Sequence, residues 1–309
     1  ENDGRIYYNG EAINKFYIEN LDLLGGRYAI ATRNISPDDI ASVSVYENHQ
    51  PVQALKDLKV SDRAALNLTL KRQRMLKPIG YVKGGAGWGE EMKWQGELFG
   101  MLVSPKNQTL VTAKGNNFGE TYRNETQQLI GDLFDTKTLA YGLFSQMPFG
   151  EAQIPRSRYL ENRSATASVN TLLKLREHLT LTFTADYIRD KDSYRNSRVT
   201  EYYATGEQPV RVAEDSRSRL GGHEANVSLK VENNASTRYV FDELRFKGRF
   251  NANDYRLSQT FPMEQSLRNR DFNVSNQFSA VFRRERRVYE VRSLVSVSHT
   301  PSNVLRASI

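Results

Sequence analysis

Apolar and polar residues alternate with a period of two along most of the chain after residue 78, and this alternation constrains the fold more than any other feature. Between Leu179 and Tyr187 every odd position is apolar or aromatic and every even position is polar. The ranges 225–231 and 244–250 repeat the pattern. Because successive side chains of a strand point to opposite faces, each range predicts a strand with one apolar and one polar face.

The same pattern, together with runs rich in β-forming residues, predicts about nine strands after residue 78. The expected ranges are 79–89, 93–103, 107–114, 158–175, 179–187, 225–231, 244–250, 270–283 and 287–299.

The expected connections between these strands alternate in length. Short ones are expected at 104–107, 175–177, 233–235 and 284–286, and long ones at 115–157, 190–216 and 257–269. Only the connection around Glu90 and Glu91 is short where a long one is expected. Tight periplasmic turns alternating with long extracellular loops are typical of a transmembrane β-barrel, whereas a β-sandwich does not sort its loops in this way. The mean hydropathy of −0.62 fits a barrel, because half of each strand faces a polar lumen.

Composition excludes several other classes. The 309 residues contain no cysteine, so a disulfide scaffold, a thiolate metal site and a cysteine nucleophile are excluded. The net charge of +7 comes from Lys and Arg residues spread between acids, and no nucleic-acid partner is expected. No stretch approaches the roughly 20 apolar residues of a transmembrane helix, and the first residues do not read as a signal peptide.

No catalytic or metal-binding pattern is present. The sequence GGHEAN, 221–226, lacks a second histidine four residues after His223, and GGAGWG, 84–89, lacks the Lys-Ser/Thr ending of a phosphate loop. The histidines, His49, His178, His223 and His299, form no recognisable constellation. We therefore expect neither an enzyme nor a bound metal or cofactor.

Residues 1–76 read as a small mixed α+β domain. An Asn9-Gly10 pair predicts a tight turn. Ser36 is the expected N-cap of a single helical turn that starts at Pro37 and runs into a strand. A further strand is expected in AALNLTLKR, 64–72.

The segment 16–57, followed by AALNLTLK, resembles the later part of the plug domain of TonB-dependent outer-membrane receptors of the SusC-like type found in Bacteroidetes. The motif I-x-P-x-x-I-x-S-V-x-V is matched by Ile35, Pro37, Ile40, Ser42, Val43 and Val45. The range 97–120 is similar to the first barrel hairpins of that family. Beyond about residue 120 only the strand pattern supports the resemblance.

The resemblance implies a mainly β fold, in which a small α+β plug domain precedes a transmembrane antiparallel β-barrel. Residues 1–76 would be the later part of the plug, and 77–309 the N-terminal portion of the barrel, with nine of a probable 22 strands and a long extracellular loop at 115–157. Nine strands leave an unpaired edge, which is costly in a membrane. The rest of the barrel would therefore lie in a longer chain, which we favour, or be supplied elsewhere. The TonB box, the early plug strands and the second half of the barrel are not in this sequence.

The resemblance also implies function. The expected activity is TonB-dependent active transport of a nutrient, whether glycan, siderophore, vitamin or peptide, across the outer membrane of a Gram-negative bacterium, with the plug gated by the proton-motive force. The expected partners are the TonB complex, outer-membrane lipid, the small nutrient ligand and a surface lipoprotein lid. The alternative is a structural, secretion or assembly barrel that keeps the same fold without nutrient uptake.

Two groups of residues are candidates for the functional site. Glu47, Asn48, His49 and Gln50 end an expected plug strand. They are expected either to pair with barrel-wall side chains such as Arg245, Lys247 and Arg249 or to form an ordinary polar strand end. The aromatic residues of the long loop either contact the ligand or pack the loop over the barrel mouth; they are Tyr122, Phe134, Tyr141, Phe144 and Phe149.

Overall fold

The computed structural model gives a mainly β protein. It describes residues 6–25, 28–59, 61–72, 77–89, 91–120, 154, 158–203, 209–258, 262–285, 287–300 and 304–308. Within these ranges no helix has the length and apolar character needed to cross a membrane.

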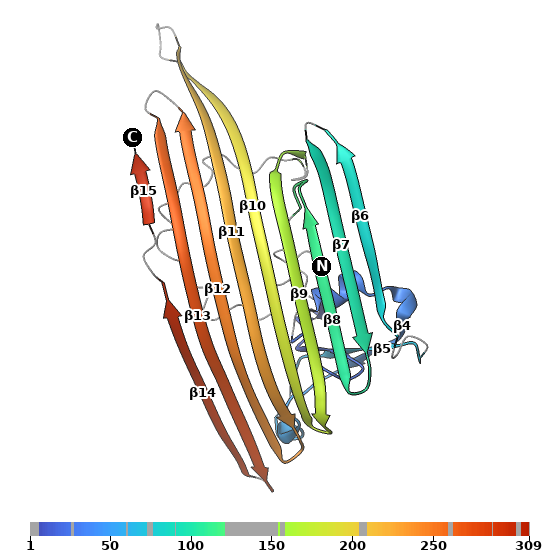
Figure 1. The fold of residues 1–309 in the computed structure, drawn as a ribbon. Helices are drawn as coiled ribbons and strands as arrows, with labels where there is room; N and C mark the ends of the chain where they lie inside the picture. Colours follow the sequence, from blue (N-terminus) through green and yellow to red (C-terminus); the bar gives the residue numbers. More distant parts are fainter. Residues whose placement is uncertain are drawn as a thin grey trace.

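One large antiparallel sheet follows the chain in sequence order, each strand pairing with the next (Figure 1). Its nine consecutive strands are β6 (Ile79–Trp88), β7 (Met92–Val103), β8 (Asn107–Asn116), β9 (Glu161–Arg176), β10 (Leu179–Tyr202), β11 (Val210–Asn234), β12 (Arg238–Ser258), β13 (Met263–Arg284) and β14 (Arg287–His299). A short strand, β15 (Val304–Ser308), pairs with the part of β13 that β14 leaves free. Over the described residues the sheet is open, with β6 at one edge and β14 and β15 at the other.

The nine predicted strands are confirmed, but the predictions of two of the three long connections are wrong. The chain expected to loop at 190–216 instead continues β10 to Tyr202 and starts β11 at Val210. The connection expected at 257–269 is reduced to the few residues between Ser258 and Met263. Both extensions are paired residue by residue with their neighbours, so cross-strand hydrogen bonds hold them. The second also carries a small buried apolar cluster that includes Leu257, Leu267 and Met263. Loop length therefore no longer separates the two ends of the sheet as the sequence suggested.

The first described residues, 6–72, form a separate small unit, called here the N-terminal unit. It contains the hairpin of β1 (Tyr7–Tyr8) and β2 (Glu11–Ala12), and a three-stranded sheet in the order β3 (Lys15–Ile18), β5 (Ala65–Leu70), β4 (Ile40–Tyr46). Its helices are α1 (Ala29–Asn34) and the 3-10 turns η1 (Pro37–Asp39) and η2 (Gln53–Leu55).

Local predictions for the N-terminal unit are confirmed at two turns. Asn9 and Gly10 both have positive φ, 51° and 86°, as a tight hairpin turn requires. The Ser36 hydroxyl accepts a hydrogen bond from the Asp38 N–H and caps η1, which leads directly into β4. Strand β3, which pairs in parallel with β5, and helix α1 were not predicted.

The two faces of the large sheet differ sharply in chemistry. Directly paired residues of antiparallel strands share a face, so the register defines rows that cross the whole sheet. One row consists only of small or apolar residues: Gly80, Gly100, Val111, Val169, Ala185, Val227, Phe246, Val274 and Val297. The adjacent row on the other face is polar except at its first two members: Tyr81, Phe99, Thr112, Ser168, Asp186, Asn226, Lys247, Asn273 and Ser298.

Burial on these faces is the reverse of that in an ordinary soluble sheet. On the apolar face the side chain of Val274 is 44% exposed and that of Val297 is 66% exposed. On the polar face Ser168 and Asp186 are buried, and the Ser168 hydroxyl donates to the Asp186 carboxylate over 2.5 Å. Exposed apolar side chains and buried polar ones occur on many strands of this sheet. The sheet therefore turns its polar face inward, and that face also carries the N-terminal unit.

Candidate functional site: the contact between the N-terminal unit and the sheet

The N-terminal unit packs on the polar face mainly near the short turns that end β7, β9, β11 and β13 (Figure 1). Toward β6–β9 the contact is mainly apolar, with two hydrogen bonds: the buried Gln108 side chain donates to the Ile18 carbonyl over 2.8 Å, and the Tyr81 hydroxyl donates to the Asn34 side chain over 2.6 Å. Phe99, Met101 and Leu110 of the sheet join one buried cluster with Phe16 and Leu70 of the unit. This explains why the row through Phe99 is apolar only at the β6 and β7 end.

Toward β11 the contact contains a buried group of charges. Lys15 and Lys230 approach the carboxylate of Asp22 at 2.5 and 3.6 Å, and Lys230 also lies 3.8 Å from Glu232. The side chains of Asp22, Lys230 and Glu232 are each no more than 16% exposed. Two lysines and two carboxylates balance in charge, as a group shielded from water requires. We call these four residues the ion cluster.

The ion cluster shifts the pKa values of Asp22 and Lys15 in opposite directions. Burial alone would raise the pKa of Asp22, but Lys15 and Lys230, with hydrogen bonds from Lys15 and the Gly25 N–H, hold it well below its usual range. Burial alone would lower the pKa of Lys15, yet Asp22 and Glu232 raise it above its usual value. Asp22 and Lys15 are therefore both charged across the physiological range.

Toward β12 and β13 the contact consists of hydrogen bonds to the segment that follows Gln50. The Asn234 side chain donates to the Pro51 carbonyl over 2.7 Å and accepts from the Gln53 N–H over 2.9 Å. Arg283 donates to the Lys56 carbonyl over 3.1 Å. Asn234 and Arg283 lie at the ends of β11 and β13, so the same end of the sheet supplies both anchors.

The structure brings the predicted segment Glu47–Gln50 next to the ion cluster. Nε2 of His49 lies 2.9 Å from the hydroxyl of Tyr17, which is two residues from Lys15. The His49 backbone donates to the Arg63 carbonyl over 2.9 Å and accepts from the Asn14 side chain over 2.8 Å. Burial and then the charge of Lys15 lower the pKa of His49 below 6.5. His49 is thus a neutral hydrogen-bonding residue that joins β3 to the end of β4.

Glu47 and Gln50 also bond within the N-terminal unit, and Asn48 makes the turn between them. Glu47 accepts from the Tyr8 hydroxyl over 2.5 Å, Asn48 has a positive φ of 50°, and Gln50 donates to the Lys59 carbonyl over 3.2 Å.

The expected wall partners of this segment have other contacts. Arg245 pairs with Glu243 at 3.1 Å, whereas Lys247 and Arg249 approach Glu224 at 3.8 and 3.6 Å. In the described part of the chain, the polar contacts of the unit with β11 and β13 come instead from the residues just after Gln50 and from Asp22.

The second group of predicted residues, Tyr122, Phe134, Tyr141, Phe144 and Phe149, lies outside the described residues. Among the described residues no group of three or more His, Cys, Asp or Glu side chains is placed to hold a metal ion.

Sequence reasoning missed the residues that make the contact. Gln53 and Asn234 are 181 positions apart, and no local pattern joins them. The one available signal was a charged residue within an alternating strand: Lys230 stands among the polar positions of β11. A scan against protein-family models and a search of curated proteins each found no match to this chain.

Proposed function

We propose that this chain is part of a TonB-dependent outer-membrane transporter, in which the large sheet is a portion of the barrel wall and the N-terminal unit a portion of the plug. One observation carries the proposal: the sheet exposes its apolar face and buries its polar face. In water this arrangement would leave a broad apolar surface uncovered, whereas a membrane barrel faces apolar side chains to lipid and polar ones to its lumen.

Dimensions support the same proposal. On β10 the apolar face runs from Leu179 to Tyr187 and then changes to Arg189 and Lys191. At roughly 3.3 Å per residue, Leu179 to Tyr187 spans about 26 Å, and this length is close to that of the roughly 9–11 residues with which a tilted strand crosses a membrane. The strand nevertheless has 24 residues, so its second half would project beyond the membrane on the side away from the short turns.

The contact between the N-terminal unit and the sheet suits a plug that must be held and then moved. A hydrogen bond exchanged for one to water costs only about 1 kcal/mol net, so water entering the lumen replaces the contacts of Asn234 and Arg283 at small cost. The ion cluster holds the unit more strongly, because separating Asp22 from Lys230 breaks a buried ion pair and leaves both charges without their partner.

In the proposed mechanism the inner-membrane TonB complex pulls on a segment N-terminal to the unit. The polar contacts toward β11–β13 yield, a path opens along the inner face, and the nutrient passes. His49 and Glu47 brace β4 against β3 and the hairpin, so that the unit moves without losing its own fold.

No covalent chemistry, metal or cofactor takes part. The loop aromatics Tyr122, Phe134, Tyr141, Phe144 and Phe149 remain the proposed ligand contacts, and a surface lipoprotein lid remains a proposed partner.

A reversible cross-link tests the proposal, since these 309 residues contain no cysteine. Gln53→Cys with Asn234→Cys would join η2 to the β11 turn where the two residues already touch. In cells whose growth on a nutrient depends on the full-length protein, oxidation should stop uptake and a reducing agent should restore it.

The matched control is Ser279→Cys with Arg292→Cys, a directly paired position within β13 and β14 that leaves the N-terminal unit free. Uptake that continues with the Gln53–Asn234 bridge fully formed would contradict plug movement. A protein required for surface assembly but for no nutrient would instead support the structural barrel.

A further inference from the structure

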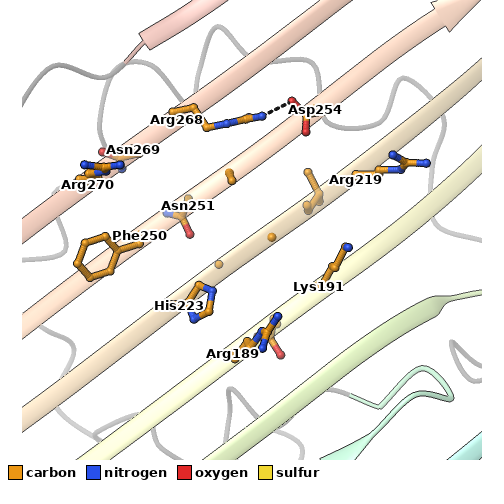
Figure 2. Close-up of a pocket in the computed structure, with 15 residues that line it drawn as sticks. Arg189, Lys191, Arg219, His223, Phe250, Asn251, Asp254, Arg268, Asn269 and Arg270 are labelled. Carbon is orange, nitrogen blue, oxygen red and sulfur yellow. Dashed lines mark hydrogen bonds and ion pairs between the residues drawn. The ribbon is translucent and has the colours of Figure 1, made fainter.

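A basic pocket lies on the outward face of β10–β13, immediately beyond the apolar band (Figure 2). Its volume is about 620 Å³. Gly221 and Ala252 are paired in one row between Lys191 and Arg268. Neither residue carries more than a methyl group, which leaves the hollow, and longer basic side chains of the same and neighbouring strands surround it (Figure 2).

The pocket carries an excess of positive charge. Five cationic side chains line it: Arg189, Lys191, Arg219, Arg268 and Arg270. Asp254 neutralises one of them, since its carboxylate lies 2.7 Å from Arg268. The other lining acid, Asp190, is buried and accepts a hydrogen bond from Ser164 on the inward side. Within the described ranges Arg189, Lys191, Arg219 and Arg270 form no ion pair.

The pocket also adjoins the apolar band directly. The row of Tyr187, Ala225, Gly248 and Phe272 is followed by the row of Arg189, His223, Phe250 and Arg270. The Phe250 and Phe272 rings meet edge to face with centroids 5.1 Å apart, and the Tyr187 hydroxyl lies 2.5 Å from Nδ1 of His223. Aromatic residues followed at once by cations are typical of a strand leaving the hydrocarbon of a membrane for its polar surface.

We propose that this pocket binds the phosphate group of a membrane lipid, whose acyl chains lie along the apolar band below it. Guanidinium groups bind phosphate oxygens in pairs, and the lipid surface supplies a high local concentration of phosphate beside Arg189 and Arg270. A soluble anion would satisfy the charge but would leave the adjoining apolar row unused. This inference rests on the proposed function, because it requires that the apolar face meet lipid.

Native mass spectrometry of the full-length protein in detergent tests the inference. The probes are phosphatidic acid, diacylglycerol with the same acyl chains, and inorganic phosphate. The double variant Arg189→Gln/Arg270→Gln should bind phosphatidic acid at least about tenfold more weakly than the wild type, because two charge-assisted contacts to the phosphate are lost. Diacylglycerol should bind both proteins equally weakly.

The matched control is Arg195→Gln/Arg256→Gln, which removes the same charge from the same outward face beyond the pocket. It should retain wild-type affinity for phosphatidic acid. Equal loss in both double variants would overturn a specific pocket in favour of diffuse charge attraction. Equal affinity for inorganic phosphate and phosphatidic acid would also overturn the lipid assignment, in favour of a free anion site.

Insertion into lipid vesicles separates this inference from the proposed function. Variants that insert normally but show no change in lipid binding contradict the pocket alone. A wild-type protein that stays in solution without detergent and fails to insert contradicts both proposals.

Discussion

The two sides of the contact beneath the N-terminal unit are built from different interactions. Toward β6–β9 the unit shares a buried apolar cluster with Phe99, Met101 and Leu110. Toward β11–β13 it is held by the ion cluster and by hydrogen bonds from Asn234 and Arg283. Apolar burial has no substitute in water, whereas polar groups can exchange partners with water. In the proposed plug, the mainly apolar side would be the permanent anchor and the polar side the releasable one.

The largest effect should come from breaking the apolar side. Phe99→Ala removes a side chain that is 2% exposed and leaves a cavity between sheet and unit. We expect the unit to lose about 3–5 kcal/mol of stability. The readout is the urea concentration at which residues 6–72 of the full-length protein become sensitive to protease. Phe246→Ala, on the outward face, is the control and should change this midpoint little. A larger shift of the midpoint in Phe246→Ala than in Phe99→Ala would reverse our assignment of the two faces.

A smaller but still strong effect should follow Asp22→Asn. The change leaves Lys15 and Lys230 facing each other without the carboxylate between them, at a cost of about 3 kcal/mol. The same protease assay measures it. Adding Lys15→Met should recover part of the loss, because one of the uncompensated charges is then gone. If the double variant were as unstable as the sum of its single changes, the cluster would not be acting as a unit.

Removing the hydrogen-bonded anchor should weaken the contact by less than the two preceding changes. Asn234→Ala deletes both bonds to the segment after Gln50, and we expect a loss of about 1–3 kcal/mol. Asn273→Ala is the control, since Asn273 also makes two side-chain hydrogen bonds, to Ser296 and Ser298, away from the unit. Hydrogen exchange at residues 51–56 reports the change directly. Equal protection of this segment in both variants would show that Asn234 does not anchor it.

The smallest expected effect is a dependence on pH. The pKa of His49 is below 6.5 in the folded unit, so between that pKa and 6.5 the unfolded unit binds more protons. Stability should be full above about pH 6.5 and fall as the pH is lowered. The lowered pKa of Asp22 acts in the same direction, but only below about pH 4.

The protease assay at pH 7.5 and pH 5 separates these contributions. His49→Gln should flatten the profile between the two values. A His49 variant that retains the full pH dependence would mean that another group titrates.

Sequence alone predicted the strands well wherever one face is apolar. Leu179 to Tyr187 alternate because one side of β10 is exposed apolar surface there. Beyond Asp190 both faces are polar, so the contrast that reveals a period of two disappears although the strand continues to Tyr202. Its length is decided by pairing with β11, which a single segment does not reveal.

The contact with the N-terminal unit was largely beyond sequence reasoning. The turn at Asn9 and Gly10 and the cap at Ser36 depend on neighbouring residues and could be read locally. Asp22 and Lys230 meet only after both the unit and the sheet have formed. Glu47–Gln50 was expected either to pair with wall side chains such as Arg245 and Lys247 or to form an ordinary polar strand end. His49 lies beside Tyr17 and the ion cluster, whereas Arg245 and Lys247 pair with Glu243 and Glu224.

Spin-label accessibility at two successive residues of β11 tests the central claim most directly. Val227 is on the apolar face and Ser228 on the polar face, and the 309 residues contain no competing cysteine. Each is changed to cysteine, labelled, and measured in the full-length protein reconstituted in lipid vesicles. We predict that the label at 227 is relaxed mainly by oxygen, which concentrates in lipid, and the label at 228 mainly by a water-soluble nickel complex. Equal access of the nickel complex to both positions would contradict a lipid-facing sheet.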